Sequence, residues 1–302
     1  MRVVATRRYP GPSFDNLDDV EILPLAELEE VREDVEGLVV ANESIPLDLL
    51  PRLRIIANYG VGYDQIDVAA CAERGILVTN TPGVLDEATA DLTLALILAT
   101  MRHVVEGDRL VRSGAWTGSW SEGRLADDVN GSTLGILGLG RIGRAVAQRA
   151  RGFDLRVLYT QRQPIETELG EFRALDALFE ESDIVTIHAP LTVDTAGLVD
   201  ARRLALLRDG ACLVNTARGE IVDEDALVAE LVSGRIRAGL DVFAHEPRVA
   251  RELLDLPNVV LTPHIGSATR QTREAMTRLV VDNLLAFERG EPPLTPVVAR
   301  TR

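Results

Sequence analysis

Short apolar runs rich in β-branched residues alternate with polar or amphipathic segments along most of the chain. In the first 80 residues this pattern predicts four strands, at 3–6, 37–41, 54–59 and 76–80. The segments around 25–36, 46–52 and 64–74 suit short helices. Such alternation is typical of βα units on a parallel sheet.

The next segment, 86–114, has an acidic start, helix-forming residues and a glycine at its end, so it predicts one long helix that links two bodies. A second series of strands follows at 133–139, 156–160, 183–189, 211–217, 238–243 and 259–264. Six strands fit the doubly wound dinucleotide fold, whose ligand lies outside the carboxyl ends of the strands. One amphipathic helix, 267–290, then leads back to the first body.

The fold class expected is therefore α/β, with two doubly wound parallel-sheet domains. A dinucleotide-binding domain, 98–267, is inserted into a substrate (catalytic) domain made of 1–97 and 268–302. We expect the site in the cleft between them.

Composition narrows the class of partner. The net charge of −15 argues against nucleic acid or an anionic membrane, since both need clustered Lys and Arg. Cys71 and Cys212 lie in apolar sequence and are expected in the core rather than in a disulfide. The N-terminus looks like a first strand rather than a signal peptide, and the longest apolar run is about half a membrane span, so we expect a cytoplasmic protein.

The stretch GLGRIG, Gly138–Gly143, satisfies G-x-G-x-x-G between a predicted strand and a predicted helix. Gly138 would permit the tight turn, Gly140 the approach of a pyrophosphate, and Gly143 close packing of helix on strand. The alternative is an ordinary strand–helix turn whose glycines serve packing.

The following strand, RVLYT, ends in Gln161 and Arg162, where an acid would hold the ribose 2′-hydroxyl of NAD. A guanidinium there would bind a 2′-phosphate, which an acid would repel. NADP(H) is the preferred cofactor on this pattern and NAD(H) is possible. The alternative is a solvated arginine on a loop.

Arg218, Glu246 and His264 each follow a late strand, at the edge where chemistry is expected. An arginine can hold a carboxylate and polarise a carbonyl, and a histidine can deliver a proton to the carbonyl oxygen. A carboxylate against that imidazole would orient it and keep it protonated. Taken singly, the three could equally be a surface ion pair, a solvated acid and a helix cap.

With these residues the chain resembles the D-isomer-specific 2-hydroxyacid dehydrogenase family over nearly its whole length. NYGVGYDQID, NTPGVLDEATAD, GILGLGRIGRAVA, NTARGEIVDEDAL, GLDVFAHEP and LTPHIGSAT stand in the family's order. VLYTQRQP and HIGSATRQTRE are most similar to the glyoxylate/hydroxypyruvate reductase branch. The resemblance implies a Rossmann dinucleotide-binding domain inserted into a flavodoxin-like substrate domain.

The resemblance also implies roles for individual residues. Arg218 would bind the substrate, Glu246 would partner the histidine, His264 would be the general acid/base, and backbone at Val61 and Gly62 would receive the carboxylate. The remaining cofactor contacts implied are Thr89, Arg141, Ile142, His188, Ala189, Pro190, Thr216, Ala217 and Asp241. His188 is expected to be a wall of the groove rather than a proton donor, and no metal site is expected because the few histidines lack ligand spacing.

The function expected is hydride transfer from NADPH to the keto carbon of glyoxylate or hydroxypyruvate, which gives the D-2-hydroxy acid. One alternative is an NAD-dependent dehydrogenase for a sugar acid such as 2-ketogluconate, or for phosphoglycerate, with Arg7, Arg8 and Arg54 as candidate phosphate ligands. Another is a nucleotide-sensing binding protein, against which the complete Arg/Glu/His set argues. The family usually forms dimers, and the segment 108–120, with Trp116 and Trp120, is a plausible self-association arm. Its aromatic side chains could equally cover a core.

Overall fold

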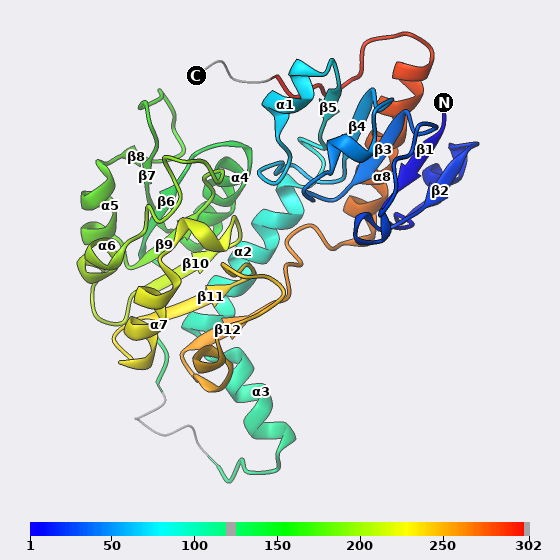
Figure 1. The fold of residues 1–302 in the computed structure, drawn as a ribbon. Coiled ribbons are helices and arrows are strands. Elements are labelled where there is room, and N and C mark those ends of the chain that lie inside the picture. The colour runs from blue at the N-terminus through cyan, green and yellow to red at the C-terminus, as the bar shows by residue number, and fades with distance from the viewer. Residues whose placement is uncertain (119–124, 299–302) are drawn as a thin grey trace. The chain divides into compact units, whose positions relative to one another are not determined.

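The computed structural model describes residues 1–118 and 125–298. The chain divides into two compact units (Figure 1), one formed by Met1–Leu85 with Ser267–Arg302 and the other by Asp86–Gly266. Trp120, part of the predicted self-association arm, lies outside the described residues.

The first unit is built on a parallel sheet in the order β2-β1-β3-β4-β5. Its strands are β1 (Val3–Ala5), β2 (Val20–Ile22), β3 (Gly37–Val40), β4 (Ile55–Asn58) and β5 (Leu77–Thr79). The helices are α1 (Val68–Glu73) and α8 (Arg270–Glu288), with 3-10 turns η1 (Pro12–Asn16), η2 (Leu25–Glu27) and η3 (Leu47–Leu49). The 2-1-3-4-5 order is that of flavodoxin-like sheets and confirms the predicted topology.

Three local predictions for this unit were wrong. Strand β2 was missed because it has only three residues on the sheet edge, where its side chains are partly exposed and give little apolar signal. The helices expected around 25–36 and 46–52 are single 3-10 turns, η2 and η3, each preceded by a proline. Proline has no N–H for a helical hydrogen bond, so it sets a turn more readily than a long helix.

The second unit is built on a seven-stranded parallel sheet in the order β12-β11-β10-β9-β6-β7-β8. Its strands are β6 (Thr133–Leu137), β7 (Arg156–Thr160), β8 (Glu171–Phe172), β9 (Ile184–Ile187), β10 (Cys212–Asn215), β11 (Arg237–Leu240) and β12 (Val259–Leu261). The six predicted strands are present, and β8 was missed because it is a two-residue, exposed edge strand. If β6 is counted as strand 1 and the sheet is read from β8, the order is 3-2-1-4-5-6 followed by a seventh strand, β12. The first six strands have the dinucleotide-binding arrangement.

Helices cover both faces of this sheet (Figure 1). They are α2 (Asp86–Met101), α3 (Val104–Arg112), α4 (Arg141–Ala150), α5 (Leu175–Glu181), α6 (Ala201–Leu206) and α7 (Glu224–Val232), with 3-10 turns η5 (Arg151–Phe153), η6 (Gly219–Ile221) and η7 (Arg251–Asp255). Along β10, Cys212 and Val214 pack with α2 and α4, whereas Leu213 packs with α5, α6 and α7. Alternate side chains thus serve two cores, which explains the nearly continuous apolar runs of the strands.

The helix predicted over 86–114 is two helices. His103 between them has a left-handed backbone (φ 52°), and α2 and α3 meet at 64°. Helix α2 is largely buried against α4, β10 and β11, whereas no residue of α3 is buried, so the chain leaves the core at His103. The unit boundary before Asp86 assigns all of α2 to the second unit, whereas the sequence-based boundary fell at 97/98. Among the described residues no single helix is long and apolar enough to cross a membrane; α2 and α3 pass only as a bent pair.

Candidate active site

The glycine-rich turn joins β6 to α4 in the second unit. Gly138 has φ 99°, and a Cβ there would stand 2.8 Å from the carbonyl oxygen of His188. A Cβ on Gly143 would stand 2.1 Å from the carbonyl oxygen of Gly138. Packing of the protein itself therefore requires glycine at both positions, because backbone atoms cannot give way.

Gly140 differs from these two glycines. It is the N-cap of α4, has a negative φ, and a Cβ there would meet no atom within 4 Å. The protein leaves open space at this position, beside N–H groups of the first helical turn that have no intrahelical acceptor. Such a cradle fits a pyrophosphate, which helix N-termini bind through these N–H groups and the helix dipole.

The predicted 2′-phosphate position follows β7. Thr160 is buried, and Gln161 folds its side chain back to donate from Nε2 to the carbonyl oxygen of Gln163 at 2.7 Å. Arg162 is exposed, and within residues 1–118 and 125–298 its guanidinium makes no ion pair. The loop therefore presents an uncompensated cation where the sequence predicted one.

His188 follows β9, and its Nε2 lies 2.8 Å from the hydroxyl oxygen of Thr186. Burial lowers the pKa of His188 to about 3, so the ring is neutral near pH 7. A ring that does not take up a proton in this range is poorly suited to acid catalysis. Its place in the cofactor groove stays a prediction.

Asn215, the last residue of β10, holds the backbone around Arg218. Its side-chain oxygen accepts from the N–H of Ala217 at 3.0 Å, and its Nδ2 donates to the carbonyl oxygen of Arg218 at 2.8 Å. A Cβ on Gly219 would stand 2.0 Å from the carbonyl carbon of Phe243. Glycine thus lets the Arg218 loop pack directly on the loop that carries Glu246.

Glu246 and His264 form an ion pair, with 2.8 Å between Glu246 Oε2 and His264 Nδ1. The other carboxylate oxygen, Oε1, accepts from the N–H of Phe243 at 3.1 Å. Glu246 is therefore held by its partners rather than left as a solvated loop acid. Because Nδ1 faces the carboxylate, Nε2 is the ring nitrogen available to a ligand.

Electrostatics keep Glu246 ionised. Burial alone would raise its pKa, but the hydrogen bond and charge of His264, the Phe243 N–H and the charge of Arg218 outweigh burial and hold the pKa below its usual value. The Arg218 guanidinium donates from Nη1 to the carbonyl oxygen of Ala217 at 2.7 Å. A cation, an anion and an imidazole thus occupy the loops after β10, β11 and β12, which are neighbours in the sheet.

Val61 and Gly62 lie in the first unit, in the loop after β4. Side-chain amides fix this loop, with Asn58 Nδ2 donating to the carbonyl oxygen of Gly62 at 2.7 Å and Asn80 Nδ2 to that of Val61 at 2.9 Å. Within the part of the chain that the structure describes, the N–H groups of Val61 and Gly62 have no acceptor. Free N–H groups on a fixed loop suit a carboxylate.

Sequence reasoning missed the three asparagines that position these loops, Asn58, Asn80 and Asn215. Each one stands at or just after the end of a buried strand, and Asn58 and Asn215 come shortly before a glycine. That placement was the available signal, since a strand-end amide can bind the backbone of the following loop.

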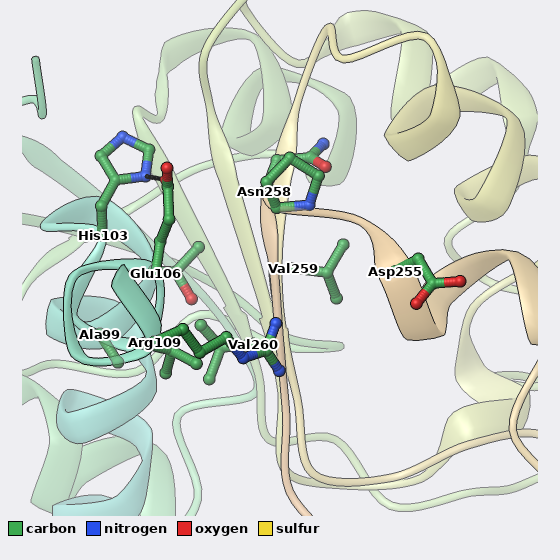
Figure 2. Close-up of a pocket in the computed structure, with 11 residues that line it drawn as sticks. Ala99, His103, Glu106, Arg109, Asp255, Asn258, Val259 and Val260 are labelled. Atoms are coloured by element: carbon green, nitrogen blue, oxygen red, sulfur yellow. Dashed lines mark ion pairs between the residues drawn. The ribbon is translucent and has the colours of Figure 1, made fainter. Parts of the chain in front are cut away.

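A pocket lies elsewhere in the second unit, where α2 and α3 meet β12 (Figure 2). Its polar lining includes His103, Glu106, Arg109 and Asp255, and none of Arg218, Glu246 or His264 takes part. In residues 1–118 and 125–298 no group of three or more His, Cys, Asp or Glu side chains is placed to hold a metal ion.

Comparisons with known proteins agree with the sequence motifs. The profile described as "D-isomer specific 2-hydroxyacid dehydrogenase, NAD binding domain" matches residues 94–266. A glyoxylate reductase from Pyrococcus horikoshii is 48% identical over 321 residues, covering 98% of this chain and 95% of that protein.

Solved structures extend the likeness to three dimensions. The TT0316 protein from Thermus thermophilus superposes with a TM-score of 0.92 at 46% identity, covering 99% of this chain and 100% of that one. An NADPH-dependent glyoxylate/hydroxypyruvate reductase from Sinorhizobium meliloti, in complex with NADP and malonate, gives a TM-score of 0.91 at 38% identity, covering 100% and 98%.

Proposed function

The chain belongs to the D-isomer-specific 2-hydroxyacid dehydrogenase family, and from that premise we propose that it reduces glyoxylate or hydroxypyruvate to the D-2-hydroxy acid with NADPH. Relatives that carry the name glyoxylate reductase and span nearly the whole chain support this substrate class. The structural observation that carries the proposal is the ion pair between His264 and Glu246 beside Arg218.

A nicotinamide bound at the cofactor site would supply the hydride for the keto carbon. Protonated His264 donates its Nε2 proton to the keto oxygen as charge develops there, while Glu246 stabilises the imidazolium through Nδ1. Arg218 binds the carboxylate and polarises the carbonyl. The N–H groups of Val61 and Gly62, in the first unit, are proposed contacts of a substrate carboxylate.

The proposed cofactor residues are those of the glycine-rich turn and of the loops after β7, β9, β10 and β11. They are Gly138, Gly140, Arg141, Ile142, Gly143, Gln161, Arg162, His188, Ala189, Pro190, Thr216, Ala217 and Asp241, with Thr89 from α2. We propose a preference for NADP(H) because Arg162 is exposed and without an ion-pair partner among the described residues. A solved relative described as NADPH-dependent supports it.

Phosphoglycerate is the weaker substrate candidate because two of the three arginines considered as phosphate ligands contact other side chains of the protein. Arg8 forms an ion pair with Asp15. Arg54 precedes β4, at the amino edge of the sheet, and stacks on the Phe287 ring at 5.0 Å. Val61 and Gly62 follow the carboxyl end of the same strand, so Arg54 lies at the opposite edge of the sheet from them.

The test is an absorbance assay at 340 nm with glyoxylate, hydroxypyruvate, 2-ketogluconate and phosphohydroxypyruvate, each with NADPH and NADH. We expect the highest kcat/KM for glyoxylate or hydroxypyruvate with NADPH. Faster turnover of 2-ketogluconate or phosphohydroxypyruvate would favour the sugar-acid or phosphoglycerate alternative. Nucleotide binding without turnover of any keto acid would favour a nucleotide-sensing protein.

We propose further that the protein is a homodimer that associates through α3. No residue of α3 is buried, and Val104 and Val111 are 55% and 58% exposed on it, with Trp116 60% exposed just beyond. Exposed apolar side chains that gather on one segment, as Val104, Val111 and Trp116 do on and just beyond α3, are typical of an interaction surface.

A further inference from the structure

Asp241 directly follows β11 and is almost completely buried, with 1% of its surface exposed. Its two carboxylate oxygens accept three hydrogen bonds from the segment that follows β12. Oδ1 accepts from the Thr262 hydroxyl at 2.6 Å and from the Ile265 N–H at 2.8 Å, and Oδ2 accepts from the Gly266 N–H at 2.8 Å. Each oxygen thus accepts at least one hydrogen bond from the protein.

These donors flank His264 on both sides. The His264 N–H also donates to the carbonyl oxygen of Asp241, at 2.9 Å. His264 has φ 52°, a left-handed conformation that costs energy for a residue with a Cβ and persists only where surrounding contacts enforce it. The contacts that enforce it here come mostly from one residue, Asp241.

Asp241 is itself fixed to the arginine loop. Its N–H donates to the carbonyl oxygen of Asn215 at 2.9 Å, and the Asn215 side chain holds the backbone at Ala217 and Arg218. Hydrogen bonds therefore run without interruption from the Arg218 loop through Asn215 and Asp241 to His264. The network can fix the imidazole relative to the guanidinium.

We propose that Asp241 is the positioning residue that holds His264 in its left-handed conformation, so that Nδ1 meets Glu246 and Nε2 faces the substrate. This role is additional to the cofactor contact proposed above, and the three protein donors to the Asp241 carboxylate all belong to the His264 segment. The proposal rests on the proposed dehydrogenase activity.

The test compares Asp241→Asn with two variants of its hydroxyl donor, Thr262→Val and Thr262→Ser. An asparagine side chain replaces one carboxylate oxygen with an NH₂ group, which cannot accept a hydrogen bond. At least one of the three hydrogen bonds from Thr262, Ile265 and Gly266 is therefore lost. We expect kcat of Asp241→Asn to fall about 10- to 100-fold, since small misplacement of a catalytic group has effects of this size. The Kd of Thr262→Val for NADPH, measured by fluorescence without substrate, should change less than about 3-fold, because that variant keeps the carboxylate proposed to contact the cofactor.

The threonine variants keep the carboxylate and so remain informative if Asp241→Asn does not fold. Thr262→Val should lower kcat in the same direction by a smaller factor, and Thr262→Ser, which retains the hydroxyl, should restore it. In Thr262→Val, a Kd for NADPH that rises as much as kcat falls would overturn the proposal in favour of an effect on cofactor binding. Unchanged kcat in both Asp241→Asn and Thr262→Val would also overturn it.

A measurement independent of turnover separates this proposal from the proposed function. The His264 Nδ1 proton should give a downfield NMR resonance while it is bonded to Glu246, assigned by its absence in His264→Asn. Asp241→Asn and Thr262→Val should weaken or shift that resonance, and Thr262→Ser should not. An unaltered resonance in the first two variants contradicts the positioning role, whether or not the protein reduces any keto acid.

Discussion

His264 and Glu246 meet at 2.8 Å although they come from loops that follow different strands. The loop of Glu246 follows β11 and that of His264 follows β12, and adjacency of these two strands brings the side chains together. A carboxylate that accepts from Nδ1 fixes the ring orientation and directs Nε2 outward. The pair therefore has the geometry of a proton donor with its orienting partner.

Replacing His264 by Asn should lower kcat for keto-acid reduction by roughly 10²- to 10⁴-fold, the usual worth of a positioned general acid. The Kd for NADPH should stay close to that of the wild type, because the glycine-rich turn is unchanged. Steady-state assays and fluorescence titration measure the two quantities. His245→Asn is the matched control, since His245 is exposed and adjacent to Glu246, and retained turnover in His264→Asn would remove the acid role.

Replacing Glu246 by Gln should reveal a pH-dependent contribution to stability. The folded protein holds the pKa of Glu246 below its usual value, so the unfolded chain binds that proton more tightly and folding gains stability as pH rises. The wild type should therefore exceed Glu246→Gln in free energy of unfolding at pH 7, and the difference should shrink below about pH 4. With the side chain 36% exposed, we expect about 1 kcal/mol or less. Urea unfolding of both proteins at pH 7 and below about pH 4 measures this difference in the free energy of unfolding. A difference that is larger below about pH 4 than at pH 7 contradicts the ion pair.

Replacing Arg162 by Ala should raise the KM for NADPH about 10- to 100-fold, because a charge-assisted bond to the 2′-phosphate is worth about 1.5–3 kcal/mol. The KM for NADH, which lacks that phosphate, should change less than about 3-fold. Gln163→Ala is the control on the same loop, since it keeps the carbonyl oxygen that Gln161 binds. Equal effects of Arg162→Ala on both cofactors would remove the assignment to the 2′-phosphate.

The sequence was sufficient to predict the topology for two reasons. Each buried strand is an apolar run, and the turn from a strand to the next helix is marked by residues such as glycine. GLGRIG illustrates this, since a strand, three glycines and a helix stand in the order that the turn needs. The sequence was insufficient where tertiary contacts decide. The break at His103 follows from α2 being buried while α3 is not, and no proline within 86–114 marks the break in the sequence.

The candidate site shows the same division. Arg218, Glu246 and His264 stand at strand ends and could be selected by residue type and position. Their mutual placement depends on which strands are neighbours, and on a glycine, Gly219, whose Cβ would overlap Phe243. Sequence spacing records neither relationship, so the part that Asp241 plays in clamping the His264 segment became visible only in the structure.

Replacing Gly140 by Ala should separate the nucleotide site from the fold. A methyl group there meets no protein atom within 4 Å, so Tm should hardly change, but it would occupy space proposed for the pyrophosphate. Because both cofactors share that group, Kd should rise at least about 10-fold for NADPH and NADH alike. Gly143→Ala should instead destabilise or unfold the protein, since its Cβ would stand 2.1 Å from a backbone oxygen.

Gly152→Ala is the neutral control for both glycine variants, because a Cβ there meets nothing within 4 Å at the far end of α4. Thermal unfolding and fluorescence titration distinguish the three variants. Unchanged cofactor binding in Gly140→Ala would show that the open space beside α4 is not the pyrophosphate site.

The exposed apolar side chains of α3 make the oligomeric state testable. The wild type should sediment at about twice the chain mass of 32.9 kDa. Val111→Asp would bury a carboxylate in the proposed interface, at a cost of about 2 kcal/mol or more, and should weaken dimerisation at least about 30-fold. The control is Val232→Asp, because Val232 is 57% exposed against 58% for Val111 but lies at the end of α7. Analytical ultracentrifugation across protein concentrations gives the dimer dissociation constants. A shift to monomer in Val111→Asp alone supports association through α3, whereas a monomeric wild type, or equal effects of both substitutions, contradicts it.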